Sequence, residues 1–173
     1  MRAPCLLFVK HDVLQRLERL QAICANSDEQ GGILIGALRG PHLEVTGLTM
    51  PGPTDERGRY HFTRQDPVHQ QAAAQHWTSS GATISFAGEW HTHPYGDGSP
   101  SGTDLASWKK LTRRSGQRMC FAIVAPQHLR LFVTTPRILT VSCEAYAECD
   151  RTADGVTFSV SASRPTIDIK RNL

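Results

Sequence analysis

Residues Phe86–Trp108 have the sequence FAGEWHTHPYGDGSPSGTDLASW, and the interpretation of the whole chain begins with them. The β-prone run ATISFAGEW ends in two histidines one residue apart, and a turn rich in Gly and Pro follows. After the turn, SGTDLASWKKLTRR places Leu105, Trp108 and Leu111 at helical spacing, so these residues are expected to face inward. We therefore predict a strand over residues 82–93 and a helix that begins at or near Ser101.

The same patterns extend along the rest of the chain. Asp12 is the expected N-cap of the first helix, whose inward apolar face is expected to extend to Ile23 and Cys24, and Asp66-Pro67 opens the second. Pro51–Gln65 is the longest loop, and at that length it is expected to be functional or mobile. This order points to an α/β sandwich whose sheet is largely antiparallel. Strands are predicted at residues 5–9, 31–40, 42–50, 82–93, 118–126, 129–135, 138–146 and 156–163, and helices at 12–24, 67–80 and 101–114.

Length and composition limit the class of protein. With 173 residues, 39% of them hydrophobic and 20% charged, the chain is long enough for one domain with a full core. We assign residues 1–163 to that domain and residues 164–173 to a loosely held C-terminal tail. The apolar runs are shorter than the roughly 20 residues that span a bilayer, and the N-terminal run is too short for a signal peptide. We therefore expect a cytoplasmic protein without a membrane partner.

Charge and cysteine usage exclude further classes. A net charge of +3 is too weak to indicate nucleic acid, and the basic run Lys109–Arg114 is interpreted as the solvated face of a helix. The five cysteines are odd in number and form no Cys-x-x-Cys pair, which argues against a disulfide framework and against a thiolate zinc site. Each cysteine is expected to be a small buried residue.

His91 and His93 form a candidate metal site. Side chains i and i+2 of a strand project from one face about 6–7 Å apart, so two imidazoles can converge on one Zn²⁺. The alternative is two ordinary histidines on a strand edge, because a chain with eight histidines is expected to contain about 0.4 His-x-His pairs by chance. Requiring Ser101 and Asp104 at fixed offsets lowers that expectation to about 0.001.

Ser101 and Asp104 have two interpretations that are compatible. Ser-x-x-Asp before an apolar helix is a capping arrangement, in which the Ser side chain accepts a backbone N–H. A carboxylate in the first turn is also held in place and favoured in its ionised form by the helix dipole, as a metal ligand requires. Two histidines and one carboxylate leave a fourth tetrahedral position for water, which is the layout of a catalytic zinc site. Such a hydrolase needs a carboxylate base, and the local sequence nominates Glu89.

The pattern His-Thr-His, seven residues, Ser, two residues, Asp at residues 91–104 closely resembles the motif of the JAMM (JAB/MPN) zinc metallopeptidase family. A second string of that family, Glu-x-Gly-Gly-x-Leu-x-Gly on the strand after the first helix, is matched by EQGGILIG at Glu29–Gly36. The resemblance extends more loosely over residues 6–133. It implies an α/β three-layer sandwich in which helices flank a curved, mixed and mostly antiparallel sheet.

The resemblance gives a role to five residues. His91, His93 and Asp104 are expected to be zinc ligands, Glu29 is expected to be the general base, and Ser101 is expected to help hold the tetrahedral oxyanion. The chemistry agrees, because zinc lowers the pKa of water to about 7 and a carboxylate can then carry the proton to the leaving amine.

Four further residues keep open interpretations. Glu89 is the less favoured base, and otherwise it orients a ligand histidine or lies on the surface. Phe62, Arg64 and Trp90 either line a channel for the tail of the substrate or have structural roles, as packing residues and as one partner of a salt bridge. An extended substrate tail is expected to add to a sheet edge as a strand, with the Pro51–Gln65 loop as its clamp.

GEWHTHP at residues 88–94, with PGPTDERGRYHFTRQD upstream, resembles a bacterial branch of the family that lies beside ubiquitin-activating and conjugating-like enzymes in anti-phage operons. The branch implies a deubiquitinase-like isopeptidase that removes a ubiquitin-like protein, or a nucleotidyltransferase of the cyclic-oligonucleotide signalling type, from its target. Two alternatives remain: the same chemistry on a sulfur-carrier protein or a cell-wall-type peptide, and a catalytically silent MPN scaffold. A zinc nucleobase deaminase is disfavoured because its Pro-Cys-x-x-Cys is absent.

Overall fold

The computed structural model describes residues 5–170 and contains, within them, eleven strands and three helices. The strands are β1 (Leu7–Lys10), β2 (Gly31–Arg39), β3 (His42–Leu48), β4 (Glu56–Gly58), β5 (His61–Thr63), β6 (Ser85–Thr92), β7 (Met119–Ala125), β8 (His128–Pro136), β9 (Thr140–Arg151), β10 (Gly155–Val160) and β11 (Ile167–Lys170). The helices are α1 (His11–Ile23), α2 (Pro67–Ser79) and α3 (Gly102–Ser115).

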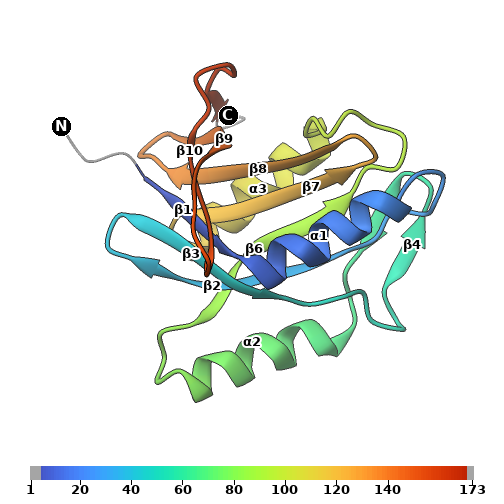
Figure 1. The fold of residues 1–173 in the computed structure, drawn as a ribbon, viewed down its shortest axis with the longest axis horizontal. Coiled ribbons are helices and arrows are strands. Elements are labelled where there is room, and N and C mark those ends of the chain that lie inside the picture. Colours follow the sequence, from blue (N-terminus) through green and yellow to red (C-terminus); the bar gives the residue numbers. More distant parts are fainter. Residues whose placement is uncertain (1–4, 171–173) are drawn as a thin grey trace.

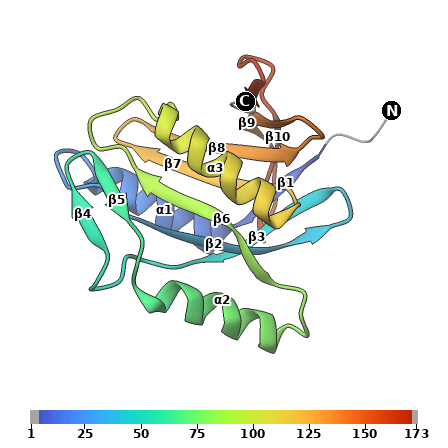
Figure 2. The ribbon, with the colours of Figure 1, turned by 180° about the vertical axis from the view of Figure 1, so that it is seen from behind.

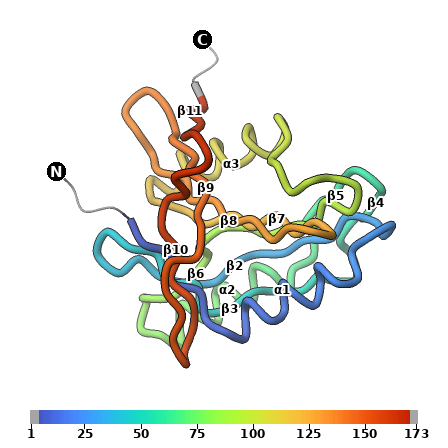
Figure 3. Tube along the Cα trace, turned by 45° about the horizontal axis from the view of Figure 1, so that its top comes forward, coloured from blue at the N-terminus to red at the C-terminus, as the bar shows by residue number. Residues whose placement is uncertain are grey.

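Eight strands close into a mixed barrel in the order β10-β1-β3-β2-β6-β7-β8-β9, with β9 paired again to β10 (Figure 1). The pairs β1–β3 and β6–β7 are parallel, and the other pairs in the ring are antiparallel. Strand β9 closes the ring because Tyr146 stands opposite Leu131 of β8 on one side and Val160 of β10 on the other. Figure 3 shows β10 and β11 running beside β9.

The predicted fold class, a three-layer α/β sandwich with a sheet flanked by helices, is therefore wrong. The sheet is not an open layer, because its two ends meet at β9 and β10. The physical reason is the length of β9, whose 12 residues allow its first half to pair with β8 and its second half with β10. The sequence pattern locates such a strand but carries no information about which neighbour each half selects.

Helix α1 supplies much of the barrel core. Its buried residues Val13, Leu14, Leu17 and Leu20 belong to one apolar cluster that includes inward residues from all eight barrel strands. The helix contacts β1, β3, β7 and β8, and Figure 1 shows it lying across the sheet. Two sequence expectations fail here. First, the N-cap position is Lys10 instead of Asp12, and no side chain caps the helix. Second, Ile23, expected on the buried face, is 67% exposed.

Helix α3 packs on the outer face of the barrel, in front of β7 and β8 in the view of Figure 2. The alternation of strand side chains sends Cys120, Ala122 and Val124 of β7 inward, while the residues between them meet α3. Trp108 stacks on Phe121 with ring centroids 4.6 Å apart. Of the residues predicted to face inward from this helix, Trp108 belongs to a second apolar cluster of buried residues, and the partly buried Leu105 and Leu111 pack against that cluster.

The remaining elements lie around the barrel. Helix α2 packs outside β2 and β6, and it begins as predicted, because Asp66 caps it through Val68 N and Pro67 is its first residue (Figure 2). The predicted long loop contains the β4–β5 hairpin, which forms a separate two-stranded sheet.

Strand β11 lies within the segment predicted to be a tail, and it pairs with β9. Residues 1–4 of the predicted domain and residues 171–173 of the predicted tail lie outside the described residues. Four cysteines are buried, as expected, and Cys149 is exposed. Within residues 5–170, none of the helices has the length and apolar character needed to cross a bilayer.

Candidate metal centre

Strand β6 carries two side-chain faces with different environments. Trp90 and Thr92 are buried in the barrel, while Glu89 and His91 point to the opposite face. His93 follows directly after β6 and lies on the same face as His91, and the two imidazoles have ring centroids 4.7 Å apart. The predicted i, i+2 geometry therefore brings both histidines to one site.

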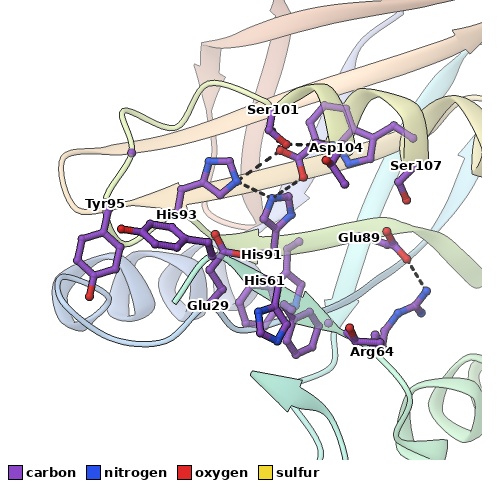
Figure 4. A pocket seen from close by; sticks show the side chains of 18 residues that line it. Glu29, His61, Arg64, Glu89, His91, His93, Tyr95, Ser101, Asp104 and Ser107 are labelled. Atoms are coloured by element: carbon purple, nitrogen blue, oxygen red, sulfur yellow. Dashed lines mark hydrogen bonds and ion pairs between the residues drawn. The ribbon is translucent and has the colours of Figure 1, made fainter. Parts of the chain in front are cut away.

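The first turn of α3 brings the carboxylate. Ser101 is the N-cap residue, and its Oγ accepts a hydrogen bond from Asp104 N at 3.1 Å. Asp104 Oδ2 accepts in turn from Ser101 N at 2.7 Å, which completes a capping box. Both interpretations of the Ser-x-x-Asp pattern thus apply to the same residues, because the capped carboxylate also faces the histidines (Figure 4).

The potential metal-ligand atoms of His91, His93 and Asp104 lie close to one another. His91 Nε2 and His93 Nε2 are 2.9 Å apart, and they lie 3.2 and 3.4 Å from the two oxygens of Asp104. Two atoms bound to the same zinc at about 2.0–2.2 Å are separated by at most about 4.4 Å, so these separations fit a single ion. The side chains are 15–16% exposed, which leaves the site accessible from the groove. This donor set of two imidazoles and a carboxylate fits zinc.

The electrostatics of the three groups also fit a cation. Burial raises the pKa of Asp104, but the imidazoles of His91 and His93 outweigh burial and hold the pKa of the carboxyl well below its usual range. Burial lowers the pKa of His93, and the nearby Asp104 more than reverses this, so the pKa of the imidazole is raised. Asp104 is therefore an anion at neutral pH, as a metal ligand must be.

Glu29 reaches the site through the register of two strands. In the antiparallel pair β2–β6, Gly31 stands opposite His91. The ladder continues for one more step, because Thr92 N donates to Gln30 O at 2.8 Å and Gln30 N donates to Thr92 Oγ1 at 3.0 Å. Glu29 therefore lies beside the end of β6, and its side chain lines the same cavity as the metal-binding cluster (Figure 4). Burial raises the pKa of Glu29, although His93 and His91 oppose the shift.

The two glycines after Glu29 are required by close packing. A Cβ on Gly31 would lie 2.6 Å from Trp90 O and 2.8 Å from the Phe62 ring. A Cβ on Gly32 would lie 2.2 Å from Thr49 O and 2.8 Å from the Trp90 indole nitrogen. The string EQGG is thus a steric requirement, since it lets β2 approach both β6 and the segment after β3.

Glu89 has a partner of its own. Its carboxylate forms an ion pair with the guanidinium of Arg64, on the residue after β5, and both side chains line the groove (Figure 4). Burial raises the pKa of Glu89, and Arg64 opposes the shift. The salt-bridge interpretation of Arg64 therefore describes the contact it makes. Trp90 is 1% exposed and donates from its indole nitrogen to Thr49 O, so most of this side chain belongs to the core.

The base of the β4–β5 hairpin is closed by a buried carboxylate, that of Asp55, for which the sequence pattern gives no signal. Asp55 Oδ1 accepts from Gln65 N and Asp66 N, each at 2.8 Å. Its Oδ2 accepts from Gly52 N at 2.7 Å and lies 2.8 Å from His69 Nε2. One side chain, 0% exposed, thus holds both ends of the segment that contains the hairpin.

His69 carries this network into the barrel. Its Nδ1 lies 2.6 Å from Thr49 Oγ1, which also accepts from Ile33 N in β2. Every donor and acceptor in this hydrogen-bond network has a partner when the His69 imidazole is neutral. Thr49 Oγ1 then donates to Nδ1, and Nε2 donates to the Asp55 carboxylate. The isolated residues gave no sequence signal, since an Asp and a His 14 positions apart become partners only in the folded chain.

The hairpin, β6 and α3 enclose a groove with a cavity volume of about 690 Å³. Glu29, Ser101 and the three metal-binding side chains lie along it, together with Phe62 and Arg64 of the hairpin segment. The structure therefore brings all five motif residues into one cavity. Chemically, the arrangement offers a cation site, a carboxylate of raised pKa and a hydroxyl at a helix N-terminus, which are the groups that hydrolysis of an amide requires.

Comparison with known proteins identifies the family of this chain. Residues 11–138 match the family model described as prokaryotic homologs of the JAB domain, so the chain belongs to that family.

Three relatives are each named CD-NTase/cGAS isopeptidase. The Pseudomonas aeruginosa protein is 39% identical over 97 residues, covering 56% of this chain and 61% of that protein. The Escherichia coli protein is 38% identical over 100 residues (58% and 64%), and the Vibrio cholerae protein is 36% identical over 108 residues (62% and 69%). The chain thus spans less than two thirds of the length of the first two relatives.

A solved structure resembles the fold. The solution structure of protein DSY2949 from Desulfitobacterium hafniense superposes with a TM-score of 0.51 at 20% sequence identity. The match covers 75% of this chain and 84% of that one. At this level of identity the likeness concerns the fold alone.

Proposed function

We propose that this chain is a zinc-dependent isopeptidase that cleaves the bond after the C-terminal residue of a protein modifier. The observation that carries the proposal is the meeting of His91, His93 and Asp104 in one groove with Glu29, within a chain of the JAB family. His91 lies in β6 and His93 follows it directly, Asp104 lies in the first turn of α3, and Glu29 lies two residues before β2.

His91, His93 and Asp104 would hold the zinc. When bound, zinc supplies Lewis acidity that polarises a carbonyl group and lowers the pKa of water to about 7. The capping box fixes the rotamer of Asp104, because Ser101 N occupies one of its oxygens. The stacking of Trp108 on Phe121 holds α3 against β7 and so keeps the carboxylate at a fixed place relative to β6.

Glu29 would act as the general base and then as the general acid. Its carboxylate accepts the proton of the attacking water and passes it to the nitrogen of the leaving lysine or peptide. Burial raises the pKa of Glu29, which makes the carboxylate a stronger base toward the proton of the water. The β2–β6 register supports this role, because it brings Glu29 to the cavity that the three metal-binding side chains also line.

Ser101 would donate a hydrogen bond to the carbonyl oxygen that becomes negatively charged. Its Oγ already accepts from Asp104 N, so the orientation of the hydroxyl is restrained while its proton stays available. Ser101 is exposed and lines the groove. A donor held in place before the reaction stabilises the developing charge without a cost of reorganisation.

Strand β5 would receive the tail of the modifier. Among the described residues its sole strand neighbour is β4, and its residues line the groove. An extended peptide can pair with the other edge of β5, and its C-terminal residue then reaches the metal centre. The Asp55 network holds the hairpin in position for this pairing.

The substrate we favour is a CD-NTase conjugate, because three relatives with identities of 36–39% are named CD-NTase/cGAS isopeptidase. Ubiquitin-activating and conjugating-like enzymes would form such a conjugate. A ubiquitin-like modifier is the second candidate, since an extended C-terminal tail would fit the groove in the same way. The metal-binding cluster argues against a silent scaffold, because a scaffold has no need of a convergent donor set.

The test uses the zinc-loaded protein and a CD-NTase joined through its C-terminal carboxyl to a lysine side chain of a reporter protein. Mass spectrometry should show release of the reporter and a CD-NTase that ends at its native C-terminal residue. The Glu29→Gln protein and a chelator-treated sample serve as controls. An intact conjugate after incubation with zinc-loaded protein, beside a ubiquitin-like fusion that is cleaved, would assign the substrate to the second candidate.

A further inference from the structure

Arg59 lies at the tip of the β4–β5 hairpin, between two aromatic rings. Its guanidinium carbon is 4.6 Å from the ring centroid of Tyr95 and 5.3 Å from that of Tyr60. The two rings are themselves 5.7 Å apart, with an interplanar angle of 54°. Tyr95, labelled in Figure 4, follows the metal-binding His93 by two residues, so the contacts of Arg59 and Tyr60 with Tyr95 join the hairpin tip to the loop beside the metal centre. We call Arg59, Tyr60 and Tyr95 the tyrosine–arginine cluster.

The guanidinium has no acidic partner within residues 5–170, and no hydrogen bond holds it there. The other arginines of the segment differ, because Arg57 donates to Gly52 O and Arg64 pairs with Glu89. Stacking uses the faces of a guanidinium and leaves its in-plane N–H groups available. Two rings restrict its rotamers in advance, so less entropy is lost when those N–H groups bind an anion.

The cluster borders the groove of the metal centre. Tyr60 and Tyr95 both line the cavity, although they are 69% and 45% exposed at its rim. A peptide that pairs with β5 passes this rim, since Tyr60 directly precedes β5. The opposite part of the groove, near Glu89 and Arg64, contains a cation that is already neutralised. The two parts of the groove therefore present different charges to a bound chain.

We infer that the tyrosine–arginine cluster is a specificity subsite that binds the carboxylate of an Asp or Glu side chain in the substrate tail. The inference rests on the proposed function, because it concerns the chain that lies in the groove. Arg59 supplies a paired hydrogen bond to the carboxylate, as guanidinium geometry favours. Tyr60 and Tyr95 hold the guanidinium and pack against the aliphatic part of the acidic side chain.

The test measures binding and cleavage separately. Fluorescent decapeptides of Gly and Ala, with one Glu at successive positions, are joined through their C-terminal carboxyl to the side chain of a lysine. Matched peptides carry Gln in place of Glu. Dissociation constants come from fluorescence anisotropy with the zinc-loaded Glu29→Gln protein, and cleavage is followed with the unaltered protein. At one position we expect the Glu peptide to bind about tenfold more tightly than its Gln partner.

Arg59→Gln should remove this preference, so that the Glu and Gln peptides bind with equal affinity. Tyr95→Leu should reduce the preference for Glu, because the Arg59 guanidinium loses one of the two aromatic rings that restrict its rotamers. The matched control is Arg114→Gln, which removes the same charge from the exposed far end of α3. Equal affinity for Glu and Gln peptides at all positions would overturn the inference, as would equal losses from Arg59→Gln and Arg114→Gln.

The outcomes separate this inference from the proposed function. Cleavage without a preference for Glu peptides would contradict the inferred subsite but remain consistent with the proposed isopeptidase activity. Preferential binding of Glu peptides without cleavage by the zinc-loaded protein supports the subsite and counts against the isopeptidase. A single-stranded oligonucleotide that binds through Arg59 while acidic peptides do not would replace the inferred ligand with nucleic acid.

Discussion

The main-chain N–H of Glu29 donates a hydrogen bond to the carbonyl oxygen of Gly58 over 2.9 Å. Glu29 precedes β2 of the barrel, and Gly58 is the last residue of β4, so this bond joins the proposed base to the inserted hairpin. The hairpin that would hold the substrate and the carboxylate that would move the proton are therefore positioned together. Substitutions that loosen the hairpin should reduce the turnover rate as well as substrate affinity.

Asp104→Ala should lower the zinc content of the purified protein, because it removes one of three ligand atoms. It also removes an acceptor of the capping box, at a cost of about 1 kcal/mol in stability. Asp104→Asn keeps a side-chain acceptor for Ser101 N but lacks the charge, and so it separates the two effects. Zinc per chain is measured by elemental mass spectrometry. A zinc content equal to that of the unaltered protein in Asp104→Ala would reduce Asp104 to a capping residue.

Glu29→Gln should keep the bound zinc and the fold but lower the rate by roughly 10²–10⁴, because the amide cannot carry a proton. Glu89→Gln is the matched control on the neighbouring strand, since its carboxylate is engaged by Arg64. The measurement is single-turnover cleavage of the conjugate, with zinc content determined on the same samples. The reverse ranking, with full activity for Glu29→Gln and loss for Glu89→Gln, would transfer the role of base to Glu89.

The buried Asp55 carboxylate should make the protein sensitive to acid. Burial raises its pKa, but the bonds from His69 and from the main-chain N–H groups of Asp66, Gly52 and Gln65 prevail and hold the pKa at about 2. In the unfolded chain an Asp has a pKa near 4, so folding stabilises the ionised form by roughly 2 kcal/mol. This contribution is complete above about pH 4 and is lost as the pH falls toward 2.

Urea unfolding followed by circular dichroism between pH 6 and pH 2 measures this effect. Asp55→Asn should lower the free energy of unfolding at pH 6 by on the order of 2–3 kcal/mol, because an amide nitrogen would face a main-chain N–H donor in place of a carboxylate oxygen. The same change should flatten the dependence of stability on pH below 4. Asp12→Asn on the exposed side of α1 is the control. An unchanged acid profile in Asp55→Asn would contradict the assignment.

Gly32→Ala should destabilise the protein by roughly 1–3 kcal/mol, since its Cβ would enter the space of Thr49 O and force the backbone to move. The displacement should also disturb Trp90, whose indole nitrogen lies 2.8 Å from that Cβ. Gly47→Ala in β3 is the matched control, because its Cβ would make an ordinary contact at 3.6 Å with Ile35. Thermal unfolding compares the two, and equal melting temperatures would show that β2 has more room than the structure indicates.

The part of the site predicted from sequence is the part that depends on local spacing. Strand alternation placed His91 and His93 on one face, and the capping pattern placed Ser101 and Asp104 in the first turn of α3. The position of Glu29 required the resemblance to a family, because it depends on the register between β2 and β6. Physical reasoning on the residues alone preferred Glu89, which the structure pairs with Arg64.

The features that the sequence did not predict depend on distant partners. Closure of the barrel depends on where β9 leaves β8 for β10, and nothing in its pattern marks that point. Strands β4 and β5 have three residues each, too few for periodicity to reveal them inside a polar loop. The exposure of Ile23 arises because the apolar face of α1 ends before the helix does.

Each of the eight barrel strands has hydrogen-bonded neighbours on both sides. In the part of the chain between residues 5 and 170, β4, β5 and β11 each have a single strand neighbour, and β5 lines the metal groove. Open strand edges are the usual starting points of fibril growth, and a closed ring offers few of them. The same architecture that leaves one edge ready to receive a peptide therefore keeps most of the sheet out of reach of other copies in a crowded cell.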